Sequence, residues 1–206
     1  MKHKIAPALF AALFLYLGLS ALSHVSYNVL DVWGQTCIDQ RKDPSVPQAT
    51  KMRVNETRLV LFKTSDLCTA TGVELETNGA RYYIRIDETT PWGNDQFPIP
   101  IGGFSTKEQE AASWYKRLYM TLFLPLRREL FEDWFRIVLR YGRTGGEEVV
   151  LEPDPTDPLI QDNIKPTRNG QLYIFVNDAV IGIPGLYGAL YKDNKGTAEL
   201  TIKRTK

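Results

Sequence analysis

GQLYIFVNDAVIGIPGLYGALYKDNKGTAELTIKR, residues 170–204, contains two runs in which apolar and polar residues alternate, joined by a glycine-containing loop. The runs cover residues 170–178 and 196–204. Such alternation is typical of a β-strand that buries one face and exposes the other. The stretch therefore predicts two strands of a β-rich domain.

Five further segments have the length, the β-branched or aromatic content and the flanking turn residues of strands. They cover residues 57–64, 71–77, 80–87, 134–142 and a short run through Val149 and Leu151. Asn78 and Gly79 tolerate positive φ, so they predict a hairpin between the second and third of these segments. About seven short strands with Gly, Pro and Asn turns predict a mainly all-β fold, an antiparallel β-sandwich of jelly-roll type.

One helix is expected inside the sandwich. Residues 89–106 are too rich in proline and glycine for regular structure, and the helix follows over residues 106–122. Thr106 is a suitable N-cap, and Trp114, Leu118 and Leu122 recur with helical spacing. Pro125 then ends or kinks the helix.

The N-terminus is directed to a membrane. Lys2 and Lys4 precede an uncharged apolar run over residues 5–22, so the basic end is expected in the cytoplasm and the rest of the chain outside it. We expect a transmembrane or signal-anchor segment over residues 1–24, a linker over 25–53 and the sandwich over 54–206. The predicted location is the inner membrane, single-pass, with a periplasmic domain, or the periplasm if the segment is cleaved.

Cys37 and Cys68 are the two cysteines of the chain, and both lie on the exported side. An even pair in an oxidising compartment predicts one disulfide. The alternative is two separate buried thiols, because free cysteine is often a core residue.

Charge and histidine content exclude several functions. The net charge is +1, so no broad basic field favours nucleic acid. Both histidines, His3 and His24, lie in or beside the apolar segment, which removes histidine-based nucleophilic systems and most catalytic zinc sites from the sandwich. The protein is therefore not expected to be an enzyme. The residual enzymatic alternative is a carboxylate-pair glycoside hydrolase, for which no spacing pairs the candidate carboxylates. These candidates are Asp95, Glu147, Glu148 and Asp178.

Oxygen-bearing side chains lie at both ends of the loop between the two alternating runs. Asn177 and Asp178 end the first run, and Asp193 and Asn194 directly precede the second. If the strands are neighbours, these side chains meet at one rim of the sandwich. Calcium accepts roughly six to eight hard oxygen ligands in flexible geometry, so the rim is a candidate calcium site. The alternative is turn chemistry, in which Asp and Asn side chains bond their own backbone.

At these residues the sequence resembles the bacterial calcium-dependent galactophilic lectins and the wider galactose-binding-like β-sandwich domains. The shared order is strand, Asn-Asp, glycine-containing loop, Asp-Asn-x-Gly-Thr and strand. The resemblance implies that Asp178 matches the calcium-binding aspartate and that Asp193 and Asn194 match the paired side chains of the turn. It extends loosely over residues 54–204.

GARYYIRIDETTPWGND, residues 79–95, is similar to the early strand of those lectins and its Trp/Asp loop. The resemblance implies ligand-binding roles for Trp92, Asn94 and Asp95, together with Asn177 beside the metal. The chain departs from the family in two places, because loop 179–192 is longer and apolar and the helical insert is foreign to the small lectins. The apolar loop predicts either a lip that meets a partner or membrane, or a segment folded onto the core.

A group of arginines follows the predicted helix, and its members are Arg127, Arg128, Arg136, Arg140 and Arg143. They either face anionic lipid headgroups or form a solvated strand face balanced by nearby acidic residues. The solvated face is the interpretation that the alternation with apolar residues favours.

The function predicted from these features is a membrane-anchored extracytoplasmic binding module for a glycan or an envelope component, with Ca²⁺ as its candidate cofactor. The main alternative is a structural or assembly partner of a membrane protein complex, without a small-molecule site. The binding module requires that Asp178, Asp193 and Asn194 have oxygen atoms free to bind a ligand. The assembly partner allows all of these oxygens to accept hydrogen bonds from the backbone.

Overall fold

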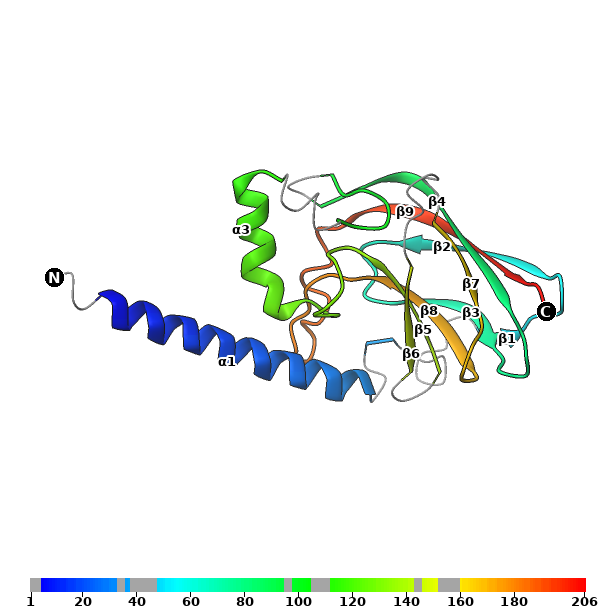
Figure 1. Ribbon diagram of the computed structural model, residues 1–206, viewed down its shortest axis with the longest axis horizontal. Helices are drawn as coiled ribbons and strands as arrows, with labels where there is room; N and C mark the ends of the chain where they lie inside the picture. Colours follow the sequence, from blue (N-terminus) through cyan, green and yellow to red (C-terminus); the bar gives the residue numbers. More distant parts are fainter. Residues whose placement is uncertain are drawn as a thin grey trace.

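The computed structural model describes residues 5–32, 36–37, 48–94, 98–104, 112–142, 146–151 and 160–206. A β-sandwich forms one end of the molecule, and a long N-terminal helix extends away from it (Figure 1). The predicted fold class, a mainly β sandwich with one inserted helix and an N-terminal apolar helix, is confirmed.

The first sheet has five strands in the order β1-β3-β8-β5-β6. Their bounds are Thr50–Lys51 for β1, Thr69–Leu75 for β3, Gly170–Val176 for β8, Ile137–Tyr141 for β5 and Glu147–Leu151 for β6. β1 runs parallel to β3, and the other neighbours are antiparallel. Every residue of β5 is buried, because this central strand is covered on both faces.

The second sheet has four antiparallel strands in the order β2-β9-β4-β7. Their bounds are Thr57–Lys63 for β2, Lys195–Arg204 for β9, Tyr82–Gly93 for β4 and Ile160–Ile164 for β7. Ala198, Leu200 and Ile202 of β9 alternate with more exposed residues and face the core. The period-2 pattern of the sequence therefore predicted both the strand and its buried face.

The hairpin predicted at Asn78 and Gly79 is wrong. The flanking strands β3 and β4 belong to different sheets, so the turn carries the chain from one sheet to the other. Gly79 does have a positive φ, +83°, as the turn signal requires. β8 and β9, predicted as possible neighbours, also lie in different sheets. Turn chemistry is local, whereas strand pairing depends on distant segments. The sequence therefore predicted the turn correctly and the strand pairing wrongly.

Two edge strands, β1 and β7, were not predicted from the sequence. β7 is the polar segment IQDNI, which has no run of apolar residues to mark it. β4 also continues through Pro91 to Gly93, into the region expected to be irregular. Edge strands tolerate polar residues because only one side of the strand is paired.

The N-terminal helix, α1 (Ile5–Val32), is longer than the segment expected to end at residue 24. Its stretch Phe10–Val29 is long and apolar enough to cross a membrane by length and composition. The C-terminal half of α1 lies against the sandwich (Figure 1).

One face of α1 makes this contact. The residues that meet the sandwich or are buried there are Tyr16, Ser20, Ser23, Tyr27 and Asp31. Spacings of three and four residues place them on a single helix face. The Oγ atom of Ser23 accepts a hydrogen bond from the Gly182 N–H at 2.8 Å. A Cβ at Gly182 would lie 1.9 Å from the Ser23 carbonyl oxygen, so this close approach requires glycine.

The inserted helix α3 (Trp114–Phe123) is followed by the 3₁₀ turn η2 (Leu124–Leu126). The proposed cap Thr106 lies outside the described residues. Met120 faces the core, whereas the predicted periodic residues Trp114, Leu118 and Leu122 are exposed. The apolar repeat therefore marks the outer face of the helix rather than its packing face.

Candidate functional site

The loop between β8 and β9 joins the two sheets at the end of the sandwich where the predicted calcium ligands lie. Tyr191, which is fully buried, fixes the start of this loop. Its hydroxyl donates to the Val176 carbonyl oxygen at 2.6 Å and accepts from the Asp178 N–H at 3.4 Å. The apolar loop is thereby held close to the core along part of its length, while Ile183 and Leu186 stay exposed.

Asp178 and Asn194 are brought together, although β8 and β9 are not the neighbouring strands that the prediction required, and they are sealed from solvent. Asp178 is 1% exposed. Its Oδ1 accepts from the Ala179 N–H at 2.7 Å, and its Oδ2 accepts from the Asn194 side-chain amide at 2.8 Å. Burial, together with the nearby charge of Asp193, raises the pKa of Asp178 to about 7. The pair is a hydrogen-bonded clasp between the start and the end of the loop.

This donor set does not fit calcium as it is arranged. Each Asp178 oxygen already accepts an N–H, and Asn194 turns its NH₂ group toward the carboxylate. The Oδ1 atom of Asn194 is buried without a hydrogen-bond partner in the described part of the chain, but one such oxygen is far short of a calcium shell. Among the described residues, no three Asp, Glu, His or Cys side chains gather in a way that could hold a metal. Calcium therefore stays a prediction of the family resemblance alone.

Asn177, a predicted ligand-binding residue, holds a turn instead. Its Oδ1 accepts from the Glu129 N–H at 2.8 Å, and its Nδ2 donates to the carbonyl oxygens of Glu129 and Asp133, both at 3.0 Å. The residue is completely buried. Both polar atoms of the side chain are thus used to fix the turn that follows η2.

Trp92 and Asn94, the other predicted ligand residues that the structure describes, are also buried. The Trp92 ring packs edge-on against Phe62 in the core, and its Nε1 donates to the Thr197 carbonyl oxygen at 3.4 Å. Gly196, with φ +116°, passes so close that a Cβ would lie 2.6 Å from the ring. Asp95 lies outside the described residues. Trp92 is therefore a packing residue of the sandwich.

The arginines that follow α3 in the sequence do not form the solvated strand face that their alternation with apolar residues predicted. Arg128 and Arg140 are buried. The Arg128 guanidinium lies 3.3 Å from the centroid of the Phe175 ring and 5.5 Å from that of Tyr27. Phe175 points away from the sandwich core, so Arg128 and α1 cover the outer face of the first sheet. Arg143 lies outside the described residues.

Asp31, near the end of α1, pairs with these arginines. It forms an ion pair with Arg140 and lies 3.8 Å from Arg128. This contact was not predicted, although the sequence carries two signals of it. Asp31 is the first acidic residue of the chain, and it continues the helical spacing of Ser20, Ser23 and Tyr27. That polar stripe is the signal of a helix that docks through one face.

The predicted disulfide between Cys37 and Cys68 is confirmed, with 5.1 Å between the Cα atoms. It links the segment after α1 to the start of β3. Arg128 supports the link, because its Nη1 donates to the Leu67 carbonyl oxygen at 2.8 Å. Such a bond is typical of an oxidising compartment outside the cytoplasm.

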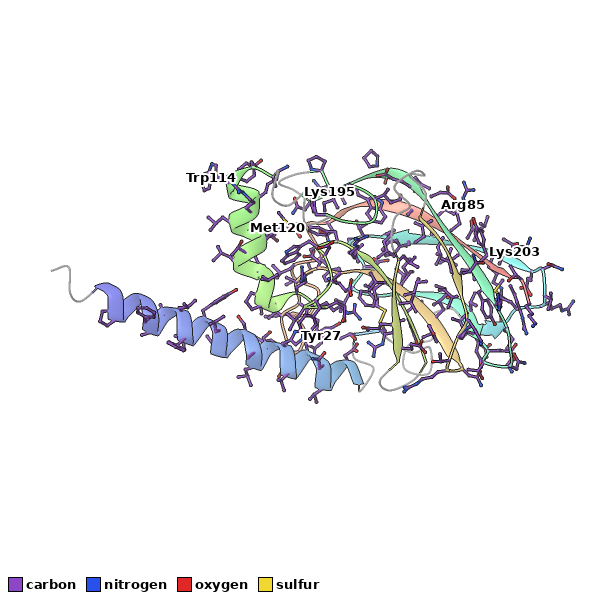
Figure 2. All side chains as sticks on the ribbon, viewed as in Figure 1. Tyr27, Arg85, Trp114, Met120, Lys195 and Lys203 are labelled. Atoms are coloured by element: carbon purple, nitrogen blue, oxygen red, sulfur yellow. A yellow bond between two sulfur atoms is a disulfide. The ribbon has the colours of Figure 1, made fainter. Side chains whose placement is uncertain are left out.

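A cavity of about 390 Å³ opens at the junction of α1 and the first sheet. Side chains from four elements line it, among them Asn28, Asp31, Glu129, Phe131, Arg140 and Glu148. Figure 2 labels Tyr27 at this junction, where the helix reaches the sandwich. The volume lies within the range of small-molecule sites.

The cavity is polar and electrically balanced. Burial, the charge of Glu148 and a hydrogen bond to it raise the pKa of Glu129 to about 8, so the Glu129 carboxyl is mostly protonated at neutral pH. The negative charges of Glu148 and Asp31 then face the positive charges of Arg128 and Arg140. At the rim the Phe131 ring is 98% exposed. The site offers donors, acceptors and an aromatic face without a net charge.

Comparisons with known proteins add little about this site. No protein-family model matches the sequence, and no curated protein matches it. Among solved structures, a similar chain is described as "EclA N-terminal domain; PllA-like lectin". It is 16% identical, with 71% of this chain and 94% of that chain covered and a TM-score of 0.42.

Proposed function

We propose that the protein is a membrane-anchored extracytoplasmic binding module whose ligand enters the cavity between α1 and the first sheet. The observation that carries the proposal is the cavity itself, which is open and polar, whereas the Asp178 clasp is closed. α1 supplies one wall of the cavity, so a ligand bound there lies close to the point where the anchor leaves the membrane.

The lining favours a neutral, polyhydroxylated ligand such as an envelope glycan. Hydroxyl groups both donate and accept hydrogen bonds, and the cavity offers carboxylate acceptors and guanidinium donors side by side. The balanced charges disfavour a strongly anionic ligand. The exposed Phe131 ring provides a flat face on which the C–H groups of a sugar can stack.

Binding is favoured over hydrolysis by the spacing of the carboxyl groups. Glu129 and Glu148 are hydrogen-bonded to each other. Glycoside hydrolases hold their two carboxyls about 5–10 Å apart, on either side of the scissile bond. A hydrogen-bonded pair leaves no room for that bond.

One observation favours the alternative, an assembly partner without a small-molecule site. Most of the described side chains to which the resemblance assigned ligand and calcium contacts are buried, namely Trp92, Asn94, Asn177, Asp178 and Asn194. In that case the cavity would be a packing defect of the docked helix, and filling it would change no binding.

The test is a glycan array probed with the full-length protein in lipid nanodiscs. Asn28 is exposed on α1 and lines the cavity, so Asn28→Trp fills the cavity without removing a described contact. Val29→Trp is the matched control, since Val29 is exposed on the same helix outside the cavity lining. We expect glycan binding that Asn28→Trp abolishes and Val29→Trp preserves. No binding by the wild type, or equal binding by Asn28→Trp, would overturn the proposal.

A further inference from the structure

The outer face of α3 is an apolar stripe with no covering element among the described residues. Trp114 is 71% exposed and Leu118 49% exposed, and Leu122 continues the stripe one turn later. Met120, on the opposite side, is buried in the core. Figure 2 labels Trp114 at the N-terminal end of α3. Large apolar side chains on one side of a short surface helix mark a contact surface.

The polar residues of α3 indicate what this surface contacts. Lys116 and Arg117 follow Trp114 and Tyr115, and α3 contains no acidic residue. Aromatic residues beside basic ones are typical of a helix at the membrane interface, where the rings lie at headgroup level and the basic groups meet anionic lipid. A protein partner would not require this one-sided charge.

α3 lies directly beside the candidate membrane span. The Tyr16 hydroxyl donates to the Leu122 carbonyl oxygen, which joins the C-terminal end of α3 to the middle of α1. In Figure 1, α3 runs across the direction of α1, as a helix lying in the plane of the membrane would. The hydrogen bond between Gly182 and Ser23 brings the exposed side chains Ile183 and Leu186 to the same side of the sandwich.

Helix length sets the depth of this contact. The hydrocarbon core is about 30 Å thick, which an α-helix crosses in about 20 residues at about 1.5 Å per residue. Lys2 and Lys4 favour the inner headgroup region, so we take the core to begin after Lys4, five residues before the candidate stretch Phe10–Val29, and its outer boundary then falls near His24. Tyr16 is eight residues before that point, about 12 Å inside the boundary. Interfacial helices bury their apolar face by about 5–10 Å, which is close to this depth.

We propose that α3, with Ile183 and Leu186, is a second membrane contact that lies in the headgroup and acyl boundary of an anionic outer leaflet. The inference rests on the membrane anchoring in the proposed function. It adds that the sandwich is held down on the membrane and does not swing freely on its anchor. The α1 cavity then opens beside the lipid surface, within reach of a membrane-bound glycan.

Nitroxide depth measurements on the full chain test the proposal. Cys37 and Cys68 are joined in a disulfide, so a single added cysteine is the reactive thiol. We would label Leu118→Cys in vesicles of phosphatidylethanolamine and phosphatidylglycerol. Accessibility to oxygen, which concentrates in lipid, is compared with accessibility to a water-soluble nickel chelate. The matched control is Val54→Cys, an equally exposed apolar site next to the C-terminal end of β9.

A third label at Phe14→Cys, on the exposed face of α1, reports on the anchor itself. We expect the oxygen-to-nickel ratio to be high at Phe14 and Leu118 and severalfold lower at Val54. A high ratio at Phe14 with a low ratio at Leu118 would overturn the α3 contact and leave the anchor intact. A low ratio at both would overturn the anchor and the α3 contact together.

Discussion

The Asp178 clasp and the cavity between α1 and the first sheet, two carboxylate sites in the described part of the chain, differ in access to solvent. At the clasp each Asp178 oxygen accepts an internal hydrogen bond and the side chain is buried. In the cavity Glu129 and Glu148 line an open space of about 390 Å³. The comparison teaches that residue types suited to a ligand form a site only where the fold leaves them room.

The largest effect is expected from Asp178→Ala. The change leaves the Ala179 N–H and the Asn194 side-chain amide without their buried hydrogen-bond partner, at a cost of about 3 kcal/mol. We would measure the free energy of unfolding at pH 5, where the folded protein holds Asp178 protonated. Lys192→Ala, an exposed change in the same loop, is the control and should shift stability by less than about 0.5 kcal/mol. Equal effects of the two variants would show that the clasp is not formed.

A pH dependence is expected next in size. The pKa of Asp178 is about 7 in the folded protein and 3.8 in a model compound, so the folded state binds the extra proton between these values. The contribution of Asp178 to the free energy of unfolding therefore falls as pH rises from about 4 to about 7, by about 2 kcal/mol between pH 5 and pH 7. Asp193 faces Asp178 and strengthens the effect, and the Tyr119 and Tyr191 hydroxyls nearby stay neutral in this range.

Asp178→Asn should remove the Asp178 part of this slope, because the Asn194 amide can turn to accept from the new NH₂ group. A slope of similar size remains, since the raised pKa of Glu129 acts in the same direction over this range and Arg128, Arg140 and Glu148 face that carboxyl. A profile that rises with pH in this range would contradict the burial of both carboxyls.

A smaller effect is expected in the cavity. Glu148→Gln removes a charge that is partly exposed and 3.8 Å from Arg140, so stability should change by less than about 1 kcal/mol. The measurement is thermal unfolding of Glu148→Gln and Asp178→Ala side by side, which compares the two losses of stability directly. A loss as large as that of Asp178→Ala would mean that the cavity is as tightly packed as the clasp.

No effect is expected from calcium at the clasp. An ion that binds only the folded state raises the midpoint of thermal unfolding, and the rise grows with the occupancy of its site. Because the Asp178 oxygens are already used, the midpoint should be the same in millimolar calcium and in chelator. A rise that Asp178→Ala removes would restore the calcium site implied by the lectin resemblance.

The sequence predicted what depends on local pattern. Alternation located strands such as β8 and β9. Asp178 does meet Asn194, but across the loop that joins the two sheets and not between neighbouring strands. Burial of that pair could not be predicted, because it depends on how Tyr191 folds the apolar loop onto the core. The α1 cavity depends on contacts between Asp31 and Arg140, which are more than one hundred residues apart. Local periodicity carries no information about such a docking.

The central claim is that ligand binds in the α1 cavity and not at the clasp. The most direct test compares Phe131→Ala with Asp178→Asn in full-length protein in nanodiscs, by calorimetric affinity for a glycan that the array identifies. We predict that Phe131→Ala weakens binding about fivefold, through loss of about 1 kcal/mol of ring contact, and that Asp178→Asn leaves the affinity unchanged. Loss of binding in Asp178→Asn with full affinity in Phe131→Ala would contradict the account.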